Sequence, residues 1–323
     1  MSWEIREGDC LDLLRSMPDC SVQCCVTSPP YWGLRDYGHG EQLGLEETPD
    51  QYVANMVEVF AEVRRVLRDD GTLWVNLGDS YATGTGRNDT DDKNLERRAA
   101  KYQTGSGAGT GPRTFSSMKH PFKPKDLCGI PWLTAFALRA DGWYLRSEII
   151  WAKPNPMPES VTDRPTKAHE QVFLLSKSPR YFYDADAIRE AHSHPEVEHI
   201  SSVKTEAQEV AFRGNAPTNL GRAGNHEAGR NKRTVWTVTT QPFSGAHFAT
   251  FPPKLIEPMI LAGSKQGDTI LDPFSGSGTT GMVALRHDRS YVGLELNPEY
   301  AALSRERIRD DAPLLNTGIE AAA

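Results

Sequence analysis

The chain lacks the features of several specialised protein classes. None of its apolar runs approaches the ~18 residues of a membrane-spanning helix, and no apolar stretch behind MSWEIREGD could act as a secretory signal. Five cysteines at irregular spacings among 323 residues are too few for a disulfide scaffold. We therefore expect a cytoplasmic protein with reduced thiols, no membrane partner and an ordinary globular core.

Two kinds of ligand site are also missing from the sequence. Cys20, Cys24 and Cys25 have no histidines at the spacing that a zinc site needs, so we expect no metal. A Walker phosphate loop is excluded because no lysine follows the glycine-rich segment that ends at Gly281. A net positive charge is absent too: 43 acidic residues outnumber 36 basic ones, so the formal net charge is -7, which argues weakly against a nucleic-acid partner.

Strand and helix patterns alternate along the chain. In the N-terminal part we expect strands at 4–7, 22–27 and 72–77 and helices at 11–17 and 50–68, the last ended by Asp70-Gly71. In the rest we expect helices at 131–139, 254–262, 279–286 and 298–309 and strands at 143–151, 269–271 and 291–296. This alternation predicts an α/β fold with a parallel, helix-flanked sheet.

The C-terminal part contains a glycine-rich turn between a predicted strand and a predicted helix. Its sequence is Asp-Pro-Phe-Ser-Gly-Ser-Gly-Thr-Thr-Gly, from Asp272 to Gly281, and Glu295 ends the next strand, where it could accept hydrogen bonds from a ribose diol. The spacing also matches the dinucleotide pattern of nicotinamide enzymes. Too few residues follow Gly281 for the rest of such a domain, and the Asp272 carboxylate suits an amino or hydroxyl group better than a pyrophosphate.

The N-terminal part contains the sequence Thr-Ser-Pro-Pro-Tyr-Trp, from Thr27 to Trp32, just past a predicted strand. Its two prolines fix an extended backbone, so that the Pro29 carbonyl stays available as an acceptor beside the Ser28 hydroxyl. Tyr31 adds an aromatic face. Two acceptors and a stacking ring suit a planar heterocycle with an exocyclic amino group, although such a turn on its own is more often structural.

Together these two motifs resemble the amino-group DNA methyltransferases, which methylate N4 of cytosine or N6 of adenine. The order, with the Ser-Pro-Pro-Tyr motif first and the glycine-rich motif last, is similar to their beta group, and most like the cytosine-N4 members. Shorter segments of the chain resemble further family motifs and extend the resemblance over nearly its whole length. They begin at Gly8, Trp151, His169, Ala246 and Glu295.

The resemblance implies a circularly permuted, Rossmann-like S-adenosylmethionine-dependent methyltransferase sheet with inserted DNA-recognition segments. The strand before Asp272 would be first, that before Glu295 second, that before Asp9 third and that before Ser28 fourth. The expected division is 1–83 catalytic half, 84–125 flexible basic insertion, 126–185 remaining catalytic core, 186–245 target recognition, 246–310 cofactor-binding part and 311–323 flexible tail.

The resemblance further implies a site-specific enzyme that transfers a methyl group from S-adenosylmethionine to a flipped cytosine in duplex DNA. Catalysis would involve Ser28, Pro29, Pro30 and Tyr31, with Tyr31 stacking on the base. The cofactor would be bound by Asp9, Cys10, Thr27, Phe251, Asp272, Pro273, Phe274, Ser275, Gly276, Ser277, Gly278, Thr279, Glu295, Leu296 and Asn297. A serine at position 28 favours cytosine, because an aspartate there mostly accompanies adenine-N6 activity in this family.

Other functions stay open at this point. The nearest is adenine-N6 methylation of DNA by the same fold. Methylation of a protein glutamine, which relatives with Asn-Pro-Pro-Tyr perform, and a DNA-binding protein without activity are more distant. The sequence leaves open a homodimer, a cognate restriction enzyme and the DNA sequence recognised.

The distribution of charged residues along the chain changes what the net charge of -7 implies. Residues 84–125 hold nine Lys or Arg and four Asp or Glu, and residues 204–233 hold six and three. We predict that both segments face DNA, the first along the phosphate backbone and the second reading sequence. The candidate DNA-binding residues are Arg213, Arg222, Arg230, Lys232 and Arg233.

Overall fold

The computed structural model describes residues 2–34, 42–82, 122–192, 229–241 and 251–311. The predicted insertion at 84–125, the recognition region at 186–245 and the tail at 311–323 therefore lie wholly or largely outside the described residues, as do Arg213 and Arg222. No helix within the described ranges is long and apolar enough to cross a membrane.

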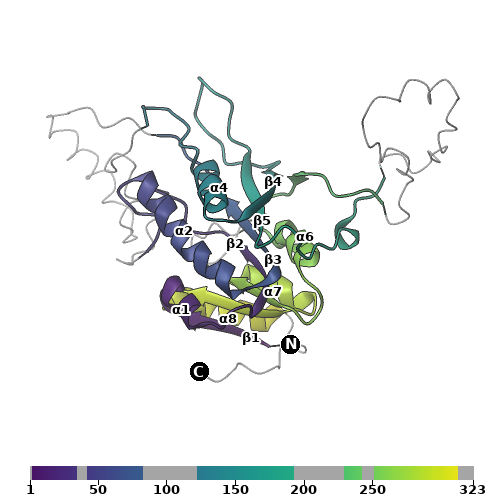
Figure 1. Ribbon diagram of the computed structural model, residues 1–323. Helices are drawn as coiled ribbons and strands as arrows, with labels where there is room; N and C mark the ends of the chain where they lie inside the picture. Colours follow the sequence, from purple (N-terminus) through teal and green to yellow (C-terminus); the bar gives the residue numbers. More distant parts are fainter. Residues whose placement is uncertain (1, 35–41, 83–121, 193–228, 242–250, 312–323) are drawn as a thin grey trace, which may run out of the picture.

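The described strands form one eight-stranded sheet in the order β1-β8-β7-β2-β3-β5-β4-β6 (Figure 1). The strands β1, β8, β7, β2 and β3 are parallel, and β5 runs antiparallel to both β3 and β4. The bounds are β1 Trp3–Glu7, β2 Val22–Thr27, β3 Leu67–Leu77, β4 Tyr144–Ala152, β5 His169–Ser176, β6 Val235–Thr237, β7 Thr269–Asp272 and β8 Ser290–Glu295. The permuted order is confirmed, because β7 lies between β8 and β2, and β1 pairs with β8.

Helices cover both faces of this sheet (Figure 1). One group consists of α1 (Cys10–Ser16), α2 (Pro49–Val66) and α4 (Ile130–Ala140), and the other of α6 (Pro253–Gly263), α7 (Thr279–Arg286) and α8 (Pro298–Asp311). Successive residues of β2 point to opposite faces, so Cys25 belongs to the core under the first group and Cys24 to the core under the second. Burial of this central strand on both faces explains why Cys24, Cys25 and Val26 follow one another without alternating with polar residues.

Helices α1 and α2 begin at side-chain caps that the sequence provides. The Asp9 carboxylate accepts from the backbone N–H groups of Leu11 and Asp12 at the start of α1. Thr48 and Gln51 form a reciprocal capping box at the start of α2. Both caps lie directly before an apolar-periodic segment, which is why these two helices were predictable.

Two expectations about the secondary structure were wrong. Helix α2 ends at Val66 rather than at 68, and β3 starts directly after it at Leu67. Asp70-Gly71 lies inside β3, where the pairing with β2 shifts from Val22–Leu67 to Cys24–Thr72. The turn signal thus marks a bulge. The sheet is also not wholly parallel, because β5, an apolar strand that the periodicity did not single out, runs in the opposite direction.

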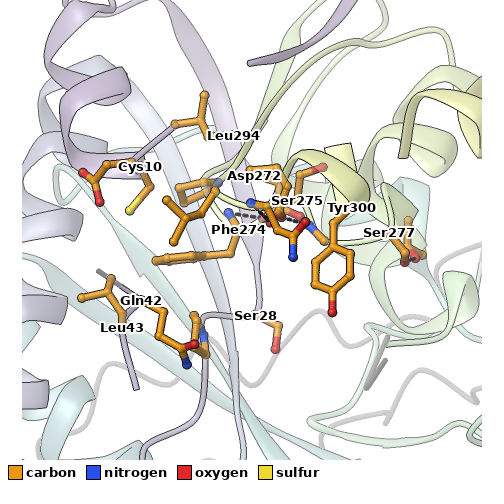
Figure 2. Close-up of a pocket in the computed structure, with 18 of the residues that line it drawn as sticks. Cys10, Ser28, Gln42, Leu43, Asp272, Phe274, Ser275, Ser277, Leu294 and Tyr300 are labelled. Carbon is orange, nitrogen blue, oxygen red and sulfur yellow. Dashed lines mark hydrogen bonds between the residues drawn. The ribbon is translucent and has the colours of Figure 1, made fainter. Parts of the chain in front are cut away.

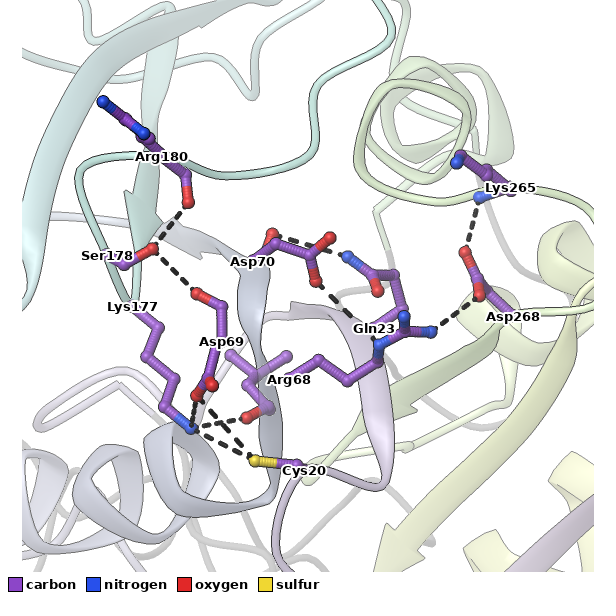
Figure 3. A network of polar contacts seen from close by, with 11 residues as sticks. Cys20, Gln23, Arg68, Asp69, Asp70, Lys177, Ser178, Arg180, Lys265 and Asp268 are labelled. Carbon is purple, nitrogen blue, oxygen red and sulfur yellow. Dashed lines mark hydrogen bonds and ion pairs between the residues drawn. The ribbon is translucent and has the colours of Figure 1, made fainter.

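Polar contacts close the end of the sheet where β3 begins and β5 ends (Figure 3). The Lys177 ammonium donates to the Leu67 carbonyl over 2.8 Å and lies 3.2 Å from the Asp69 carboxylate. The Ser178 hydroxyl donates to the Asp69 carbonyl over 2.8 Å. The pocket described below lies at the opposite end of these strands.

Candidate active site

The carboxyl ends of four strands meet beside one pocket. Strand β1 leads to Asp9 and β2 to Ser28, while β7 ends at Asp272 and β8 at Glu295. Open α/β sheets bind ligands at this end, where the strand order reverses. The pocket therefore joins the two motifs that lie about 245 residues apart in the sequence.

The structure brings most of the predicted site residues to this pocket. Fifteen of them line it: Asp9, Cys10, Ser28, Pro30, Phe251, Asp272, Pro273, Phe274, Ser275, Gly276, Ser277, Thr279, Glu295, Leu296 and Asn297. Four predicted residues do not line it: Thr27, Pro29, Tyr31 and Gly278. Sequence reasoning missed Gln42, Leu43, Leu294 and Tyr300. Figure 2 shows Ser28, Gln42 and Leu43 along one side of the pocket and Cys10 and Leu294 along the other, with Phe274 between them.

Among the missed residues, only Tyr300 carried a usable signal. It lies three residues after Asn297 and in the first turn of α8, where its backbone N–H donates to the Asn297 carbonyl. Residues three positions apart at the start of a helix lie on the same face, so Tyr300 is expected beside Asn297. Gln42 and Leu43 stand in a segment without periodicity, so nothing in the sequence pointed to them.

Asp272 holds the pocket floor together. Its carboxylate is 1% exposed and accepts from the hydroxyls of Thr27 (2.6 Å) and Thr280 (2.7 Å) and from the backbone N–H of Phe274 (3.1 Å). Burial raises the pKa of Asp272 to about 6, and these three hydrogen bonds oppose the rise. Thr27 thus acts on the pocket through Asp272.

Glu295 is held with its charge toward the glycine-rich turn. One carboxylate oxygen accepts from the backbone N–H of Gly276 over 2.8 Å and the other from that of Asn297 over 2.9 Å. Burial raises the pKa of this carboxyl. Each oxygen keeps a further lone pair, so the carboxylate can still accept hydrogen bonds from a diol.

Two of the three glycines of the turn are required by packing within the protein. A Cβ on Gly278 would lie 2.2 Å from the Ser304 hydroxyl, and one on Gly281 would lie 2.5 Å from the Tyr291 ring. At Gly276 an added Cβ would meet only the Phe274 carbonyl at 3.8 Å, so that glycine alone faces open space. Gly276 and Gly278 have φ values of 52° and 74°, which favour glycine on their own account.

The Ser-Pro-Pro-Tyr motif is fixed from behind. The Tyr52 hydroxyl, on α2, donates to the Pro30 carbonyl over 2.9 Å. The Tyr31 ring packs on Gly78, where an added Cβ would lie 2.4 Å from a ring carbon. The Tyr31 hydroxyl turns to a buried polar cluster that contains Glu170. Trp32 is 1% exposed and belongs to the core, so it contributes no surface to the pocket.

Cys10 lines the pocket as a neutral thiol. Burial raises its pKa to about 12, and the negative charge of Asp9 adds to the rise. A protonated thiol is a poor nucleophile. The pocket thus offers acceptors and apolar walls. No cluster of three or more metal-ligating side chains occurs within the described ranges.

Three of the predicted DNA-binding residues converge on one acid. Arg230, Lys232 and Arg233 approach the Glu190 carboxylate within 3.4, 3.6 and 3.5 Å. The Arg233 side chain is 68% exposed. These three cations meet the Glu190 carboxylate at the edge of the sheet beside β6.

Comparison with known proteins agrees with this geometry. A family model described as DNA methylase matches residues 22–306. The chain belongs to this DNA methylase family. The methylase is 49% identical over 305 residues to the Type II methyltransferase M.Cfr9I of Citrobacter freundii, aligning 94% of this chain with 87% of that one. It is 46% identical over 309 residues to the Type II methyltransferase M.SmaI of Serratia marcescens, with coverage of 95% and 91%.

Solved structures show the same fold. The PvuII DNA methyltransferase, which is cytosine-N4-specific, superposes with a TM-score of 0.60 at 19% identity, covering 98% of the methylase and 93% of that chain. A Thermus thermophilus protein complexed with S-adenosyl-L-methionine superposes with a TM-score of 0.57 at 23% identity, covering 97% of each chain. These likenesses confirm the permuted methyltransferase fold, and membership of the DNA methylase family confirms the expected S-adenosylmethionine cofactor.

The pocket of the methylase fits this cofactor chemically. Phe251, Phe274 and Leu296 provide apolar walls for a planar base, and the Glu295 carboxylate provides acceptors for a ribose. Helix α7 begins without a side-chain cap, and Thr279 in its first turn lines the pocket, so backbone N–H groups there can receive a carboxylate.

Proposed function

We propose that the protein is a Type II DNA methyltransferase that methylates the N4 amine of a cytosine flipped out of duplex DNA. The observation that carries the proposal is that Ser28, at the end of β2, lines the same pocket as the segment from Asp272 to Ser277 and Glu295. An amine bound at Ser28 is thereby next to the place where the cofactor fits. A base within a duplex cannot enter such a pocket, so the target must leave the stack.

The exocyclic amine of cytosine is a poor nucleophile because its lone pair is delocalised into the ring. In our proposal the Ser28 hydroxyl oxygen and the Pro29 carbonyl each accept one N–H of this amine. Both bonds favour a pyramidal nitrogen whose lone pair faces the methyl donor, so positioning and electrostatics supply the catalysis. When bound, S-adenosylmethionine supplies an activated methyl group on a sulfonium.

No covalent intermediate with the base is required. Carbon-5 cytosine methyltransferases use a cysteine that follows a proline, and no Pro-Cys pair occurs in this sequence. The one thiol that lines the pocket, Cys10, stays protonated. The proposed transfer is therefore direct: the amine nitrogen forms its new bond to the methyl carbon as the bond from that carbon to the donor sulfur breaks, and the methylated amine then releases one proton to water.

Cytosine is favoured over adenine by Ser28. In the family that the two motifs resemble, a serine at this position mostly accompanies cytosine-N4 activity, whereas an aspartate mostly accompanies adenine-N6 activity. Methylation of adenine N6 is the alternative, and it requires no change in the rest of the site.

The DNA partner is proposed to contact the basic surface at Arg230, Lys232 and Arg233, together with Arg213 and Arg222. The Type II names of its relatives support a role in a restriction-modification system, with a cognate restriction enzyme that cuts unmethylated sites. The enzyme would then act in the cytoplasm, associated with the nucleoid through DNA. A homodimer of the enzyme is also proposed.

The decisive experiment is methylation of unmethylated duplex DNA of mixed sequence, followed by digestion to nucleosides and mass spectrometry. We expect N4-methylcytosine from the wild-type protein and at most traces from Ser28→Ala. N6-methyladenine without N4-methylcytosine would contradict the base assignment, and the absence of both would contradict the proposed function.

A further inference from the structure

A buried polar cluster lies directly behind the Ser-Pro-Pro-Tyr motif. The Tyr31 hydroxyl donates to one oxygen of the Glu170 carboxylate over 2.9 Å. The Asn76 side-chain amide donates one N–H to the same carboxylate oxygen over 2.7 Å and its other N–H to the Tyr31 oxygen. The Ser28 hydroxyl lies 3.3 Å from the Tyr31 oxygen. The other Glu170 oxygen accepts from the Lys153 ammonium.

Three neighbouring strands hold the cluster together. Asn76 stands on β3 opposite Val172 of β5, and Glu170 stands on β5 opposite Trp151 of β4. The Glu170 and Lys153 side chains are 17% and 18% exposed, so their pair is largely withdrawn from solvent. The antiparallel strand β5 therefore places a carboxylate under the catalytic motif.

The donors and acceptors of this cluster can be counted. A phenol has one proton and two lone pairs, a side-chain N–H can only donate, and a carboxylate can only accept. The proton of Tyr31 is thus committed to Glu170, and its two lone pairs accept from Asn76 and Ser28. Burial and the charge of Glu170 raise the pKa of Tyr31 well above its ordinary value, so the phenol keeps this proton. The reverse orientation of the Asn76 amide would set its oxygen against the Glu170 carboxylate.

From this count we infer that Glu170 is a positioning residue that, through Tyr31, sets the direction of the Ser28 hydroxyl. With Tyr31 unable to donate to it, Ser28 must point its only proton at Tyr31. Its lone pairs are then free to accept an N–H from the target amine. This inference rests on the proposed function, because it gives Ser28 the acceptor role that amine methylation needs.

The direction of the Ser28 O–H bond matters because a serine hydroxyl can donate a hydrogen bond as well as accept one. A freely rotating Ser28 would spend part of its time with its proton toward the amine, where it could not accept an N–H. Phe at position 31 removes the acceptor while it keeps the ring on Gly78. Gln at position 170 must present an N–H either to Lys153 or to the Tyr31–Asn76 pair, so it disrupts the order of donors without a change in size.

The test measures single-turnover methyl transfer to mixed-sequence duplex DNA at saturating S-adenosylmethionine for Glu170→Gln, Tyr31→Phe and the double variant. Each single variant is expected to be roughly 100-fold slower than wild type, and the double variant no slower than the slower single variant. The Kd for S-adenosylmethionine, measured by calorimetry, should stay within about twofold of wild type, since the cluster does not line that part of the pocket. Glu170→Asp should restore part of the rate.

Glu62→Gln on α2 is the matched control, because Glu62, whose side chain is 24% exposed, is likewise a largely buried carboxylate paired with a cation, Arg65, and its rate should equal that of wild type. Single variants within about threefold of the wild-type rate, or a double variant whose loss is the product of the two single losses, would overturn the inference. A wild-type protein that methylates neither amine would refute the proposed function and the inference with it. Methylation of adenine alone would refute only the base assignment, because the rate ratios still decide the role of Glu170.

Discussion

The Thr27 hydroxyl donates to the Asp272 carboxylate over 2.6 Å and so joins β2 to β7 at the floor of the pocket. The bond connects the strand that carries the catalytic motif to the strand that carries the cofactor motif. Asp272 also accepts from Thr280 and from the Phe274 backbone, so its carboxylate organises both sides of the turn. The protein thus buries a charge to bring its two motifs into register.

This burial predicts a pH-dependent cost to stability. The pKa of Asp272 is about 6 in the folded protein, against an ordinary value of 3.8, so the protonated form is favoured by folding. The stabilisation from this group is fully present below pH 3.8 and is lost as the pH rises through 6. Asp272→Asn removes the titration, and its free energy of unfolding relative to wild type should rise by on the order of 3 kcal/mol from pH 4 to pH 7.

Urea denaturation at pH 4, 5, 6 and 7 measures this difference. Asp141→Asn, an exposed position at the end of α4, is the control and should give curves that run parallel to those of wild type. If the curves of Asp272→Asn also run parallel to wild type, burial does not perturb Asp272 in the way that the geometry indicates.

Gly78 should be essential for activity although it does not line the pocket described above. Gly78→Ala sets a Cβ 2.4 Å from the Tyr31 ring, so Tyr31 and with it Ser28 must move. A misplacement of about 1 Å at a catalytic group costs on the order of 100-fold in rate, and we expect that loss in methyl transfer with cofactor affinity unchanged. Steady-state kinetics and calorimetry measure the two quantities.

The control for Gly78 is Gly267→Ala, at a turn before β7 where an added Cβ meets nothing within 4 Å. Its φ of 85° imposes a strain of about 1 kcal/mol on an alanine, so it lowers stability without touching the motif. Equal losses of activity in the two variants would show that the Gly78 effect is general destabilisation rather than displacement of Tyr31.

The sequence predicted the parts of the fold that depend on local signals. The caps at Asp9 and Thr48 lie directly before periodic apolar residues, and the two motifs follow apolar strands, so α1, α2 and the strand ends were accessible. Asp70-Gly71 was misread as a helix end because a bulge and a turn use the same residue types. The antiparallel direction of β5 depends on its partners β3 and β4, which no local pattern reveals.

The candidate site shows the same division. Residues of the two motifs were predicted to lie together, and fifteen of the predicted site residues line the pocket. Asn76 carries no motif, and the importance of Glu170 for Tyr31 arises from the pairing of three strands. Gly278, expected to bind the cofactor, is required instead by Ser304 on α8, a contact between segments that sequence spacing does not encode.

Glu295 should contribute to cofactor affinity more than to the transfer rate. Glu295→Gln removes the charge and turns one of the two backbone-bonded oxygens into an N–H, which opposes the N–H of Gly276 or Asn297. Loss of a charge-assisted hydrogen bond to a ribose hydroxyl predicts a rise in the Kd for S-adenosylmethionine of about tenfold or more. Calorimetry measures the Kd, and the rate at saturating cofactor should change little.

Glu299→Gln provides the comparison for Glu295, since Glu299 is exposed on α8 and does not line the pocket. It should bind the cofactor as wild type does. A Glu295→Gln protein with wild-type affinity would remove this residue from the cofactor site.

Arg233 should contribute to DNA binding through the phosphate backbone. Its side chain is 68% exposed, and the acid it approaches, Glu190, is shared with Arg230 and Lys232, so neutralisation by Glu190 is incomplete. Arg233→Ala should weaken binding to duplex DNA and reduce the slope of log K against log salt by about 0.9, the value for one phosphate contact. Fluorescence anisotropy between 50 and 200 mM salt, with a duplex of mixed sequence, measures this slope.

Arg68→Ala is the matched control, because Arg68 is half exposed at the opposite end of the strands, where it lies 3.5 Å from Asp268 (Figure 3). If Arg68→Ala lowers the slope as much as Arg233→Ala does, the basic surface beside β6 has no special role in DNA binding.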